Sequence, residues 1–307
     1  VCFKYKKTGK KNVIDNINLH INSGEIVGII GGTGSAKTTL VQMIPRLYDV
    51  TEGVVKVGGR PVTDYTLKNL RDSVAMVLQK NTLFSGTVRE NIAFGKDDAT
   101  DDEVIQAAKT ASAHSFIMRL AEGYNTMLTG DGANLSGGQR QRICIATALA
   151  LQPKFVVCDE AVSALDVSIQ AQIINLLQDL KEKQDLTYLF ITHDLSVVKY
   201  ISDRIGVMYL GNMVELADSQ EIFDNPVHPY TEALLNAIPT TEDEGHKDLQ
   251  ILEGDIPSPV NPPKGCKFHT RCAYCTEICK QVVPEWEEVS PNHFVACHHK
   301  LTKKAEA

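Results

Sequence analysis

Residues 25–39 read EIVGIIGGTGSAKTT, which is an apolar run, a glycine-rich turn and then a segment with helical spacing. The apolar run predicts a buried strand, and the turn has the context of the phosphate-loop pattern G-x-x-x-x-G-K-[ST], between a strand and a helix, and matches it at all but one position. In such a loop, successive backbone N–H groups and the start of the helix hold phosphates. We therefore expect Lys37 to reach the β- and γ-phosphates and the Thr38 hydroxyl to ligate Mg²⁺.

The loop departs from the pattern at one position, because Ala36 stands where glycine is expected. If that position needs a backbone conformation disfavoured for alanine, the strain amounts to about 1–3 kcal/mol. Every 1.4 kcal/mol corresponds to about tenfold in affinity, so ATP binding and turnover depend on this residue. For the loop alone, the alternative is a glycine-rich turn without a ligand.

Two later apolar runs also end in polar residues. Residues 155–160 (FVVCDE) end in Asp159 and Glu160, and residues 186–191 are followed by Thr192 and His193. Open α/β sheets place their ligands at the carboxyl ends of such strands. One acid there can hold Mg²⁺ through water, and the second can orient or deprotonate an attacking water.

Strand and helix patterns alternate from residue 25 to about residue 208, which predicts an α/β fold with a parallel sheet. Residues 101–121 are expected to form a helix with Thr100 as its N-cap. The formal net charge of −7 over 307 residues argues against nucleic acid as a partner. No segment approaches the roughly 18 apolar residues of a membrane span, and no apolar leader opens the sequence. We therefore expect a reducing, intracellular setting.

Residues 135–139 (LSGGQ), followed by Arg140, Gln141 and Arg142, lie between the phosphate loop and the acidic strand. This string resembles the signature of ATP-binding-cassette (ABC) ATPases, and the resemblance covers essentially the whole chain. It implies a phosphate-loop α/β core, an antiparallel β portion near the N-terminus and a helical subdomain. It also implies that two such domains pack head to tail around two ATP molecules. The signature of one would then contact the γ-phosphate held by the other, for which a helix N-terminus with small residues is suited.

The resemblance implies roles for individual residues. Glu160 corresponds to the catalytic base, His193 to the switch histidine at the γ-phosphate, and Gln79 to the glutamine that senses Mg²⁺ and water. Tyr5 corresponds to the aromatic residue that stacks on adenine, with Phe3 as a neighbouring candidate. The Mg²⁺ ligands would be Thr38, Gln79 and Asp159. The implied nucleotide-binding set is Tyr5, Gly31, Gly32, Thr33, Gly34, Ser35, Ala36, Lys37, Thr38, Thr39, Gln79, Ser136, Gly137, Gly138, Gln139, Asp159, Asp166 and His193.

The two parts of the chain resemble different transporters. Residues 64–95 and 123–134 are similar to exporter ATPases of the multidrug and lipid type. The segments similar to oligopeptide and dipeptide importer ATPases are residues 162–172, 192–198, 207–211 and 226–231 and the whole tail. The chain therefore resembles a mosaic with a junction near Leu135.

The importer resemblance implies an ATPase at the cytoplasmic face of the membrane, bound peripherally. Its partners would be a second ABC ATPase subunit, the same or different, transmembrane permease subunits and, indirectly, a substrate-binding protein. Two alternatives stay open. One is the nucleotide-binding domain of an exporter, and the other is a low-turnover regulatory subunit that senses nucleotide or metal.

The expected domains are an ATPase domain at residues 1–238, with its helical subdomain at about 87–150, a linker at 239–264 and a tail at 265–307. In the tail, the spacing Cys266-x5-Cys272-x6-Cys279-x17-Cys297 supplies four soft ligands. Four such ligands are enough for an iron–sulfur cluster or Zn²⁺, and similar tails in peptide-importer ATPases carry a [4Fe–4S] cluster in some members. The alternative is a set of reduced structural thiols. The tail is expected to lie away from the phosphate chemistry.

Overall fold

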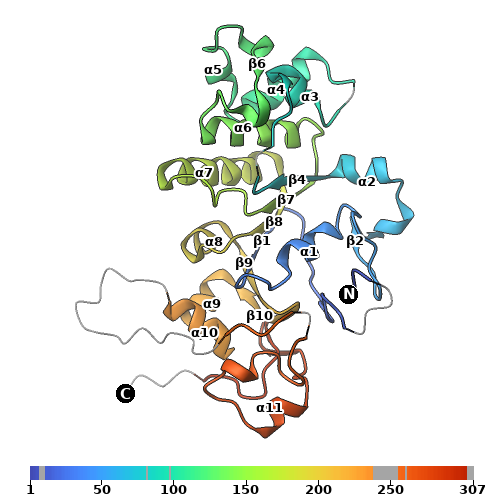
Figure 1. The fold of residues 1–307 in the computed structure, drawn as a ribbon, viewed down its shortest axis with the longest axis vertical. Coiled ribbons are helices and arrows are strands. Elements are labelled where there is room, and N and C mark those ends of the chain that lie inside the picture. The colour runs from blue at the N-terminus through green and yellow to red at the C-terminus, as the bar shows by residue number, and fades with distance from the viewer. Residues whose placement is uncertain (7–10, 81, 97, 238–254, 260, 303–307) are drawn as a thin grey trace, which may run out of the picture.

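The computed structural model describes residues 1–6, 11–80, 82–96, 98–237, 255–259 and 261–302. Its main sheet has eight strands in the order β11-β12-β10-β9-β1-β8-β7-β4 (Figure 1). The strands are β4 (Val74–Leu78), β7 (Phe155–Asp159), β8 (Thr187–Ile191), β1 (Ile26–Ile30), β9 (Arg204–Tyr209), β10 (Asn212–Asp218), β12 (His293–Val295) and β11 (Glu287–Ser290). From β4 to β9 neighbouring strands are parallel, and the remaining three pair antiparallel. The predicted α/β fold with a parallel core is confirmed.

The central strands are buried on both faces, which explains why they read as continuous apolar runs. Helix α1 (Lys37–Gln42) packs on one face, where Leu40 and Val41 share a core with Val27. Helices α7 (Val167–Gln184) and α8 (Leu195–Ile201) pack on the other face, around Tyr188 and Phe190. The sheet thus lies between helix layers, and the phosphate loop leaves the carboxyl end of its central strand.

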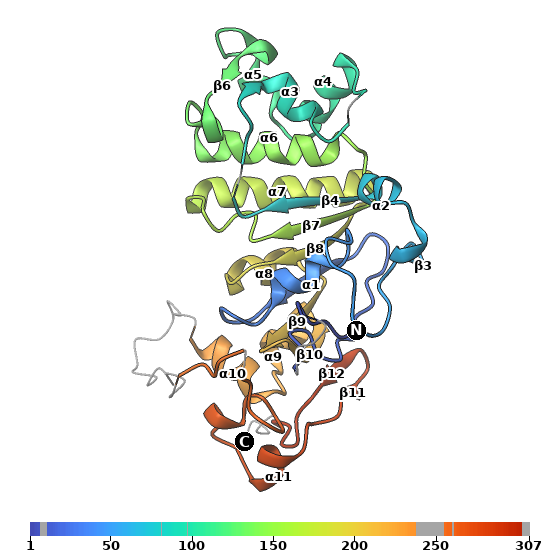
Figure 2. The ribbon, with the colours of Figure 1, turned by 45° about the vertical axis from the view of Figure 1, so that its right-hand side comes forward.

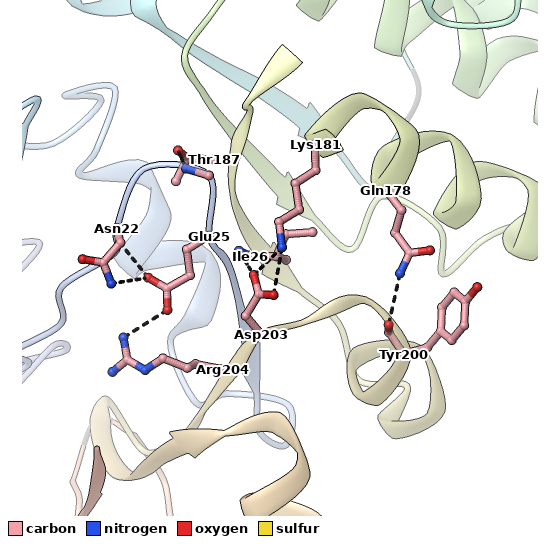
Figure 3. Close-up of polar contacts among 10 residues, drawn as sticks. Asn22, Glu25, Ile26, Gln178, Lys181, Thr187, Tyr200, Asp203 and Arg204 are labelled. Atoms are coloured by element: carbon pink, nitrogen blue, oxygen red, sulfur yellow. Dashed lines mark hydrogen bonds and ion pairs between the residues drawn. The ribbon is translucent and has the colours of Figure 1, made fainter. Parts of the chain in front are cut away.

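Polar side chains fix the opposite end of that strand (Figure 3). Asp203 accepts a hydrogen bond from the backbone N–H of Ile26 at 2.7 Å and pairs with Lys181 of α7 at 2.6 Å. Arg204 pairs with Glu25 at 3.2 Å. These contacts join β1, β9 and α7 away from the site, so the carboxyl end of β1 has a fixed position.

The helical subdomain lies at one end of the molecule (Figure 2). Its elements are β5 (Gly86–Thr87), α3 (Val88–Ala93), α4 (Asp101–Thr110), α5 (His114–Ile117), β6 (Met127–Leu128) and α6 (Gly137–Leu149). Thr100 caps α4 in a capping box with Glu103, as predicted. The single helix expected over 101–121 is wrong, because Ser112 adopts φ 51° and separates α4 from α5.

The remaining elements near the N-terminus form the expected antiparallel portion. Cys2 pairs with Glu52, Phe3 pairs with Ile14, and a short hairpin follows. The other elements of the chain are β2 (Lys56–Val57), β3 (Arg60–Pro61), α2 (Leu67–Ser73), α9 (Ser219–Asp224), α10 (Pro229–Asn236) and α11 (Glu277–Gln281), with 3₁₀ turns at Val62–Asp64, Gly123–Asn125, Gly130–Gly132 and His269–Arg271. Among the helices of the described ranges, none is long and apolar enough to cross a membrane.

The Cys-rich tail continues the core sheet. Strand β12 pairs with β10 through Glu215 opposite Val295, and His293 Nε2 lies 2.7 Å from the buried Glu215 carboxylate. Of the linker expected at 239–264, residues 239–254 and 260 lie outside the described residues. Arg271 of the tail lines a small cavity together with Gly32, so the expectation that the tail lies away from the phosphate loop was wrong. That expectation followed from the interpretation as an importer ATPase, with the tail near a regulatory end, and a resemblance in sequence does not show where the tail packs.

Candidate functional site

Ala36 adopts a left-handed backbone conformation with φ 71° and ψ 24°, immediately before α1. Residue 36 therefore has a backbone conformation that is disfavoured for alanine, which is the condition under which we expect strain. A residue with a Cβ atom is disfavoured in this region by about 1–2 kcal/mol, because Cβ approaches the following carbonyl oxygen. Glycine carries no such penalty, which gives a physical reason for glycine in the pattern.

Replacing Ala36 by glycine is expected to lower the KM for ATP by about five- to thirtyfold, because the binding conformation of the loop then carries no Cβ strain. Steady-state ATPase measurements over a range of ATP concentrations check this. Ala36→Ser is the matched control, because it retains a Cβ atom and should retain the higher KM. Unchanged KM and kcat in Ala36→Gly would contradict the strain argument.

Lys37 is held inside its own loop. Its side chain is buried, and Nζ donates to Gly31 O at 2.7 Å and to Ser35 Oγ at 3.3 Å. Burial lowers the pKa of the Lys37 ammonium, and the Glu160 and Asp159 carboxylates oppose that shift. An ammonium that bonds only to loop oxygens can exchange these contacts for phosphate oxygens, which form stronger charge-assisted hydrogen bonds.

Thr38 and Asp159 come together as predicted. Thr38 Oγ1 donates to Asp159 Oδ1 at 3.3 Å, and Asp159 is the last residue of β7. Burial raises the pKa of the Asp159 carboxyl, while the hydrogen bond from Thr38 opposes the rise. A hydroxyl and a carboxylate are oxygen ligands of the kind that Mg²⁺ prefers, so the residues present fit this ion.

Three more of the predicted site residues lie at the carboxyl ends of the parallel strands: Glu160, His193 and Gln79. His193 Nδ1 is 3.6 Å from Glu160 Oε2, and the imidazole is largely exposed. Ser163 Oγ donates to Glu160 O at 2.9 Å, and Gln79 Nε2 donates to Ser163 Oγ at 3.4 Å. Glu160 itself has φ 52°, a left-handed conformation in which its backbone N–H bonds Ile191 O of β8 at 3.0 Å. The contact of Gln79 with Ser163 was not predicted, and no sequence pattern indicates it.

The ring of Tyr5 is exposed, whereas that of Phe3 is buried. Tyr5 is 54% exposed and Phe3 only 3%. The Tyr5 hydroxyl shares a hydrogen bond with Thr39 Oγ1 at 2.8 Å, which ties this ring to the start of α1. Of the two candidates for stacking on adenine, the geometry therefore favours Tyr5, because Phe3 belongs to the core.

Ser136 begins helix α6 in a capping box. Gln139 N–H donates to Ser136 Oγ at 3.3 Å, and Ser136 N–H donates to Gln139 Oε1 at 3.0 Å. Gly138 needs to lack a side chain, because a Cβ atom there would lie 2.6 Å from Ile169 Cγ2 of α7. Asp166 caps α7 by accepting from Ile169 N–H at 3.0 Å. The signature thus presents an exposed helix N-terminus on a tightly packed helix pair.

The signature lies far from the phosphate loop of the same chain. Helix α6 contacts β4 at one edge of the sheet, whereas Lys37 follows β1. Three strand spacings separate β1 from β4, or about 14 Å, and Figure 2 shows α7 between α6 and α1. Ser136 and Lys37 therefore do not meet within one chain.

The tail does not support the expected metal centre. Burial raises the pKa of the Cys266 thiol to about 11 and that of Cys297 to about 12, with further contributions from the neighbouring Cys272 and Cys279. Because Cys272 and Cys279 contribute to both shifts, these thiols lie within electrostatic range of one another. Cys297 Sγ also donates to His299 O at 3.2 Å. Within the described residues, no three His, Cys, Asp or Glu side chains are placed to hold a metal ion.

Comparisons with known proteins place these features in context. Residues 14–163 match the family model described as "ABC transporter", and residues 214–279 match "Oligopeptide/dipeptide transporter, C-terminal region". The first match runs through Leu135 without a break, so the junction there stays a prediction.

Two curated relatives and one solved structure are similar over most of the chain. The oligopeptide transport ATP-binding protein AppF of Bacillus subtilis (strain 168) is 43% identical over 95% of this chain and 91% of its own length. OppF of Haemophilus influenzae, another oligopeptide transport ATP-binding protein, is 37% identical over 95% of this chain and 90% of its own. The solved structure of a bacterial Atm1-family ABC exporter with ATP bound matches with TM-score 0.67 at 32% identity. That match covers 76% of this chain and 40% of the exporter chain.

Proposed function

The chain belongs to the ABC transporter family, among the oligopeptide/dipeptide transport ATP-binding proteins, and we propose that it hydrolyses Mg-ATP at the site around Lys37 to energise peptide import. The observation that carries the proposal is the convergence of the phosphate loop with Asp159, Glu160, His193 and Gln79 at one sheet edge. This edge lies at the carboxyl ends of parallel strands, where such sheets bind ligands.

Each residue of the site has its own role in phosphoryl transfer. Loop amides and Lys37 bind the β- and γ-phosphates, and the exposed Tyr5 ring stacks on adenine. Glu160 accepts a proton from the attacking water, and His193, 3.6 Å away, contacts the γ-phosphate and keeps this carboxylate in place. Thr38 and Asp159 would hold Mg²⁺, with Gln79 beside them, and the bound ion would neutralise charge that develops on the phosphates. No step requires a metal centre in the tail.

A second ATPase subunit completes each site. Because the helix that Ser136 caps packs against α7 and the edge strand β4, three strands from β1, Ser136 would reach a γ-phosphate only from another subunit packed head to tail. The exposed N-terminus of α6 then supplies backbone N–H groups to that phosphate. Hydrolysis would remove the shared ligand, so the two subunits would separate in each cycle.

Membrane subunits would bind next to the helical subdomain. Phe84 and Phe94 stack with ring centroids 4.3 Å apart, yet both remain at least half exposed. They lie shortly after Gln79, whose link to Ser163 connects that surface to the hydrolysis site. We therefore place the permease contact here, at the cytoplasmic face, with a substrate-binding protein acting from the other side.

Two alternatives have some support. The 32% identity with an ABC exporter favours exporter coupling, and the strained Ala36 favours a subunit with low turnover. The importer relatives match nearly the full chain at higher identity, and the tail matches their C-terminal region. These matches favour import.

Peptide uptake into liposomes tests the proposal. The protein is reconstituted with oligopeptide permease subunits, ATP is enclosed with the ATPase subunits, and a fluorescent peptide and its binding protein are added outside. We expect ATP-dependent accumulation of peptide in the lumen. In a second set of liposomes the peptide is enclosed instead, and its ATP-dependent release would establish the exporter alternative. Absence of hydrolysis in both sets would establish the regulatory one.

A further inference from the structure

The phosphate loop is held from outside by Tyr230, a residue without a role in the mechanism above. The backbone N–H of Gly32 donates to the Tyr230 hydroxyl at 2.8 Å. Tyr230 lies in the first turn of α10 and is 2% exposed. The two residues are 198 positions apart in the chain. The bond therefore joins the loop to a distant, packed element.

A second external contact holds the loop at Ser35. Its carbonyl oxygen accepts from Gly211 N–H at 3.0 Å, in the turn between β9 and β10. Leu210 in that turn has φ 44°, which is unfavourable for a bulky side chain. Lys267 of the tail donates to Leu210 O at 3.3 Å and to Asp15 Oδ2 at 3.4 Å. The tail thus supports the turn that holds the loop.

The tail also covers Tyr230 directly. The Phe268 ring lies 5.2 Å from the Tyr230 ring and 5.2 Å from the Tyr209 ring, and it is buried. Arg271 lines the same small cavity as Gly32. Burial raises the pKa of the Tyr230 hydroxyl, and the nearby Arg271 guanidinium opposes that rise. Tyr230 is consequently enclosed between the phosphate loop and the tail.

The contacts at Gly32 and Ser35 help to maintain the strained backbone conformation of Ala36. A residue in a disfavoured backbone conformation persists only where its surroundings determine that conformation. Ala36 directly follows Ser35, and the Ser35 N–H bonds Gly32 O at 3.2 Å within the loop. Fixing Gly32 and Ser35 from outside therefore restricts the segment that leads into Ala36.

We infer that Tyr230 is a positioning residue of the phosphate loop, and that the C-terminal tail supports ATP binding by enclosing Tyr230 and the Leu210 turn. The inference rests on the proposed function only in assigning the loop to ATP. It gives the tail a role in nucleotide affinity that needs no metal.

Tyr230→Phe tests the inference, because it removes the hydroxyl and keeps the ring. We expect the Kd for ADP and the KM for ATP to rise about five- to tenfold, with kcat within about twofold. ADP binding is measured by equilibrium titration and needs no turnover, so a chain without ATPase activity would refute the proposed function but not this inference. Tyr188→Phe is the matched control, since its buried hydroxyl has no partner within the described residues.

Two further variants test the link to Ala36 and to the tail. In an Ala36→Gly background, Tyr230→Phe should change the Kd less, since the loop no longer needs as much external support. Lys267→Met, which keeps the stem and loses both hydrogen bonds, should raise the Kd about two- to threefold. An unchanged Kd in Tyr230→Phe, with unfolding temperatures equal to that of the parent, overturns the inference. An unchanged Kd in Lys267→Met alone overturns the role of the tail.

Discussion

Replacing Glu160 by glutamine is expected to lower kcat for ATP hydrolysis by about 10²- to 10³-fold without raising the KM. The amide is nearly isosteric with the carboxylate, and the backbone bond from residue 160 to Ile191 O does not depend on the side chain. What is lost is the ability to accept a proton from the attacking water. His193, 3.6 Å from the carboxylate, contacts the γ-phosphate in the proposed mechanism, so we do not expect it to replace the lost base.

The measurement is steady-state phosphate release, together with the Kd for ATP. Glu182→Gln, the same substitution at an exposed position on α7, is the matched control and should hydrolyse at the parental rate. A Glu160→Gln protein that hydrolyses ATP as fast as its parent would remove this residue from the mechanism. An equal loss in both variants would show a general effect of charge.

The sequence predicts the core of this site because its signals are local. The phosphate loop, the strand that ends in Asp159 and Glu160, and the strand before His193 each consist of a short apolar run with polar residues at its end. Parallel pairing of such runs brings their carboxyl ends together without any further information. The left-handed conformation of Ala36 was also predictable, since a missing glycine indicates where a positive φ occurs.

The placement of the tail could not be predicted in this way. Strand β12 has three residues, and it pairs with β10 about 80 positions earlier. The contact between Tyr230 and Gly32 likewise joins positions far apart. Such contacts depend on which surfaces remain uncovered after the core has formed. The hydrophobic periodicity of the sequence does not indicate these surfaces. Cysteine spacing has the same limit, because it gives the number of thiols but not the direction in which each points.

Two further substitutions should each abolish hydrolysis, for different reasons. Lys37→Ala is expected to raise the Kd for ATP by at least about 100-fold, because the phosphates lose their charge-assisted hydrogen bonds in a buried loop. Ser136→Arg should leave ATP binding to the isolated chain unchanged, since the helix that Ser136 caps packs against α7 and β4, three strands from the strand that leads into that loop. It should still stop hydrolysis, because a bulky cation at the start of α6 blocks the close approach of a second subunit's nucleotide.

Mixing the two inactive proteins is the decisive measurement. In a head-to-tail pair made of one copy of each, one site combines both defects, while the other combines an intact Lys37 with an intact Ser136. With equal amounts, half of the pairs are mixed and half of their sites are intact, so about a quarter of the unsubstituted activity should return. Catalysis within single chains predicts no recovery at any ratio. A mixture as inactive as its components, beside an unsubstituted protein that hydrolyses ATP, would therefore show that the phosphate is not shared between copies.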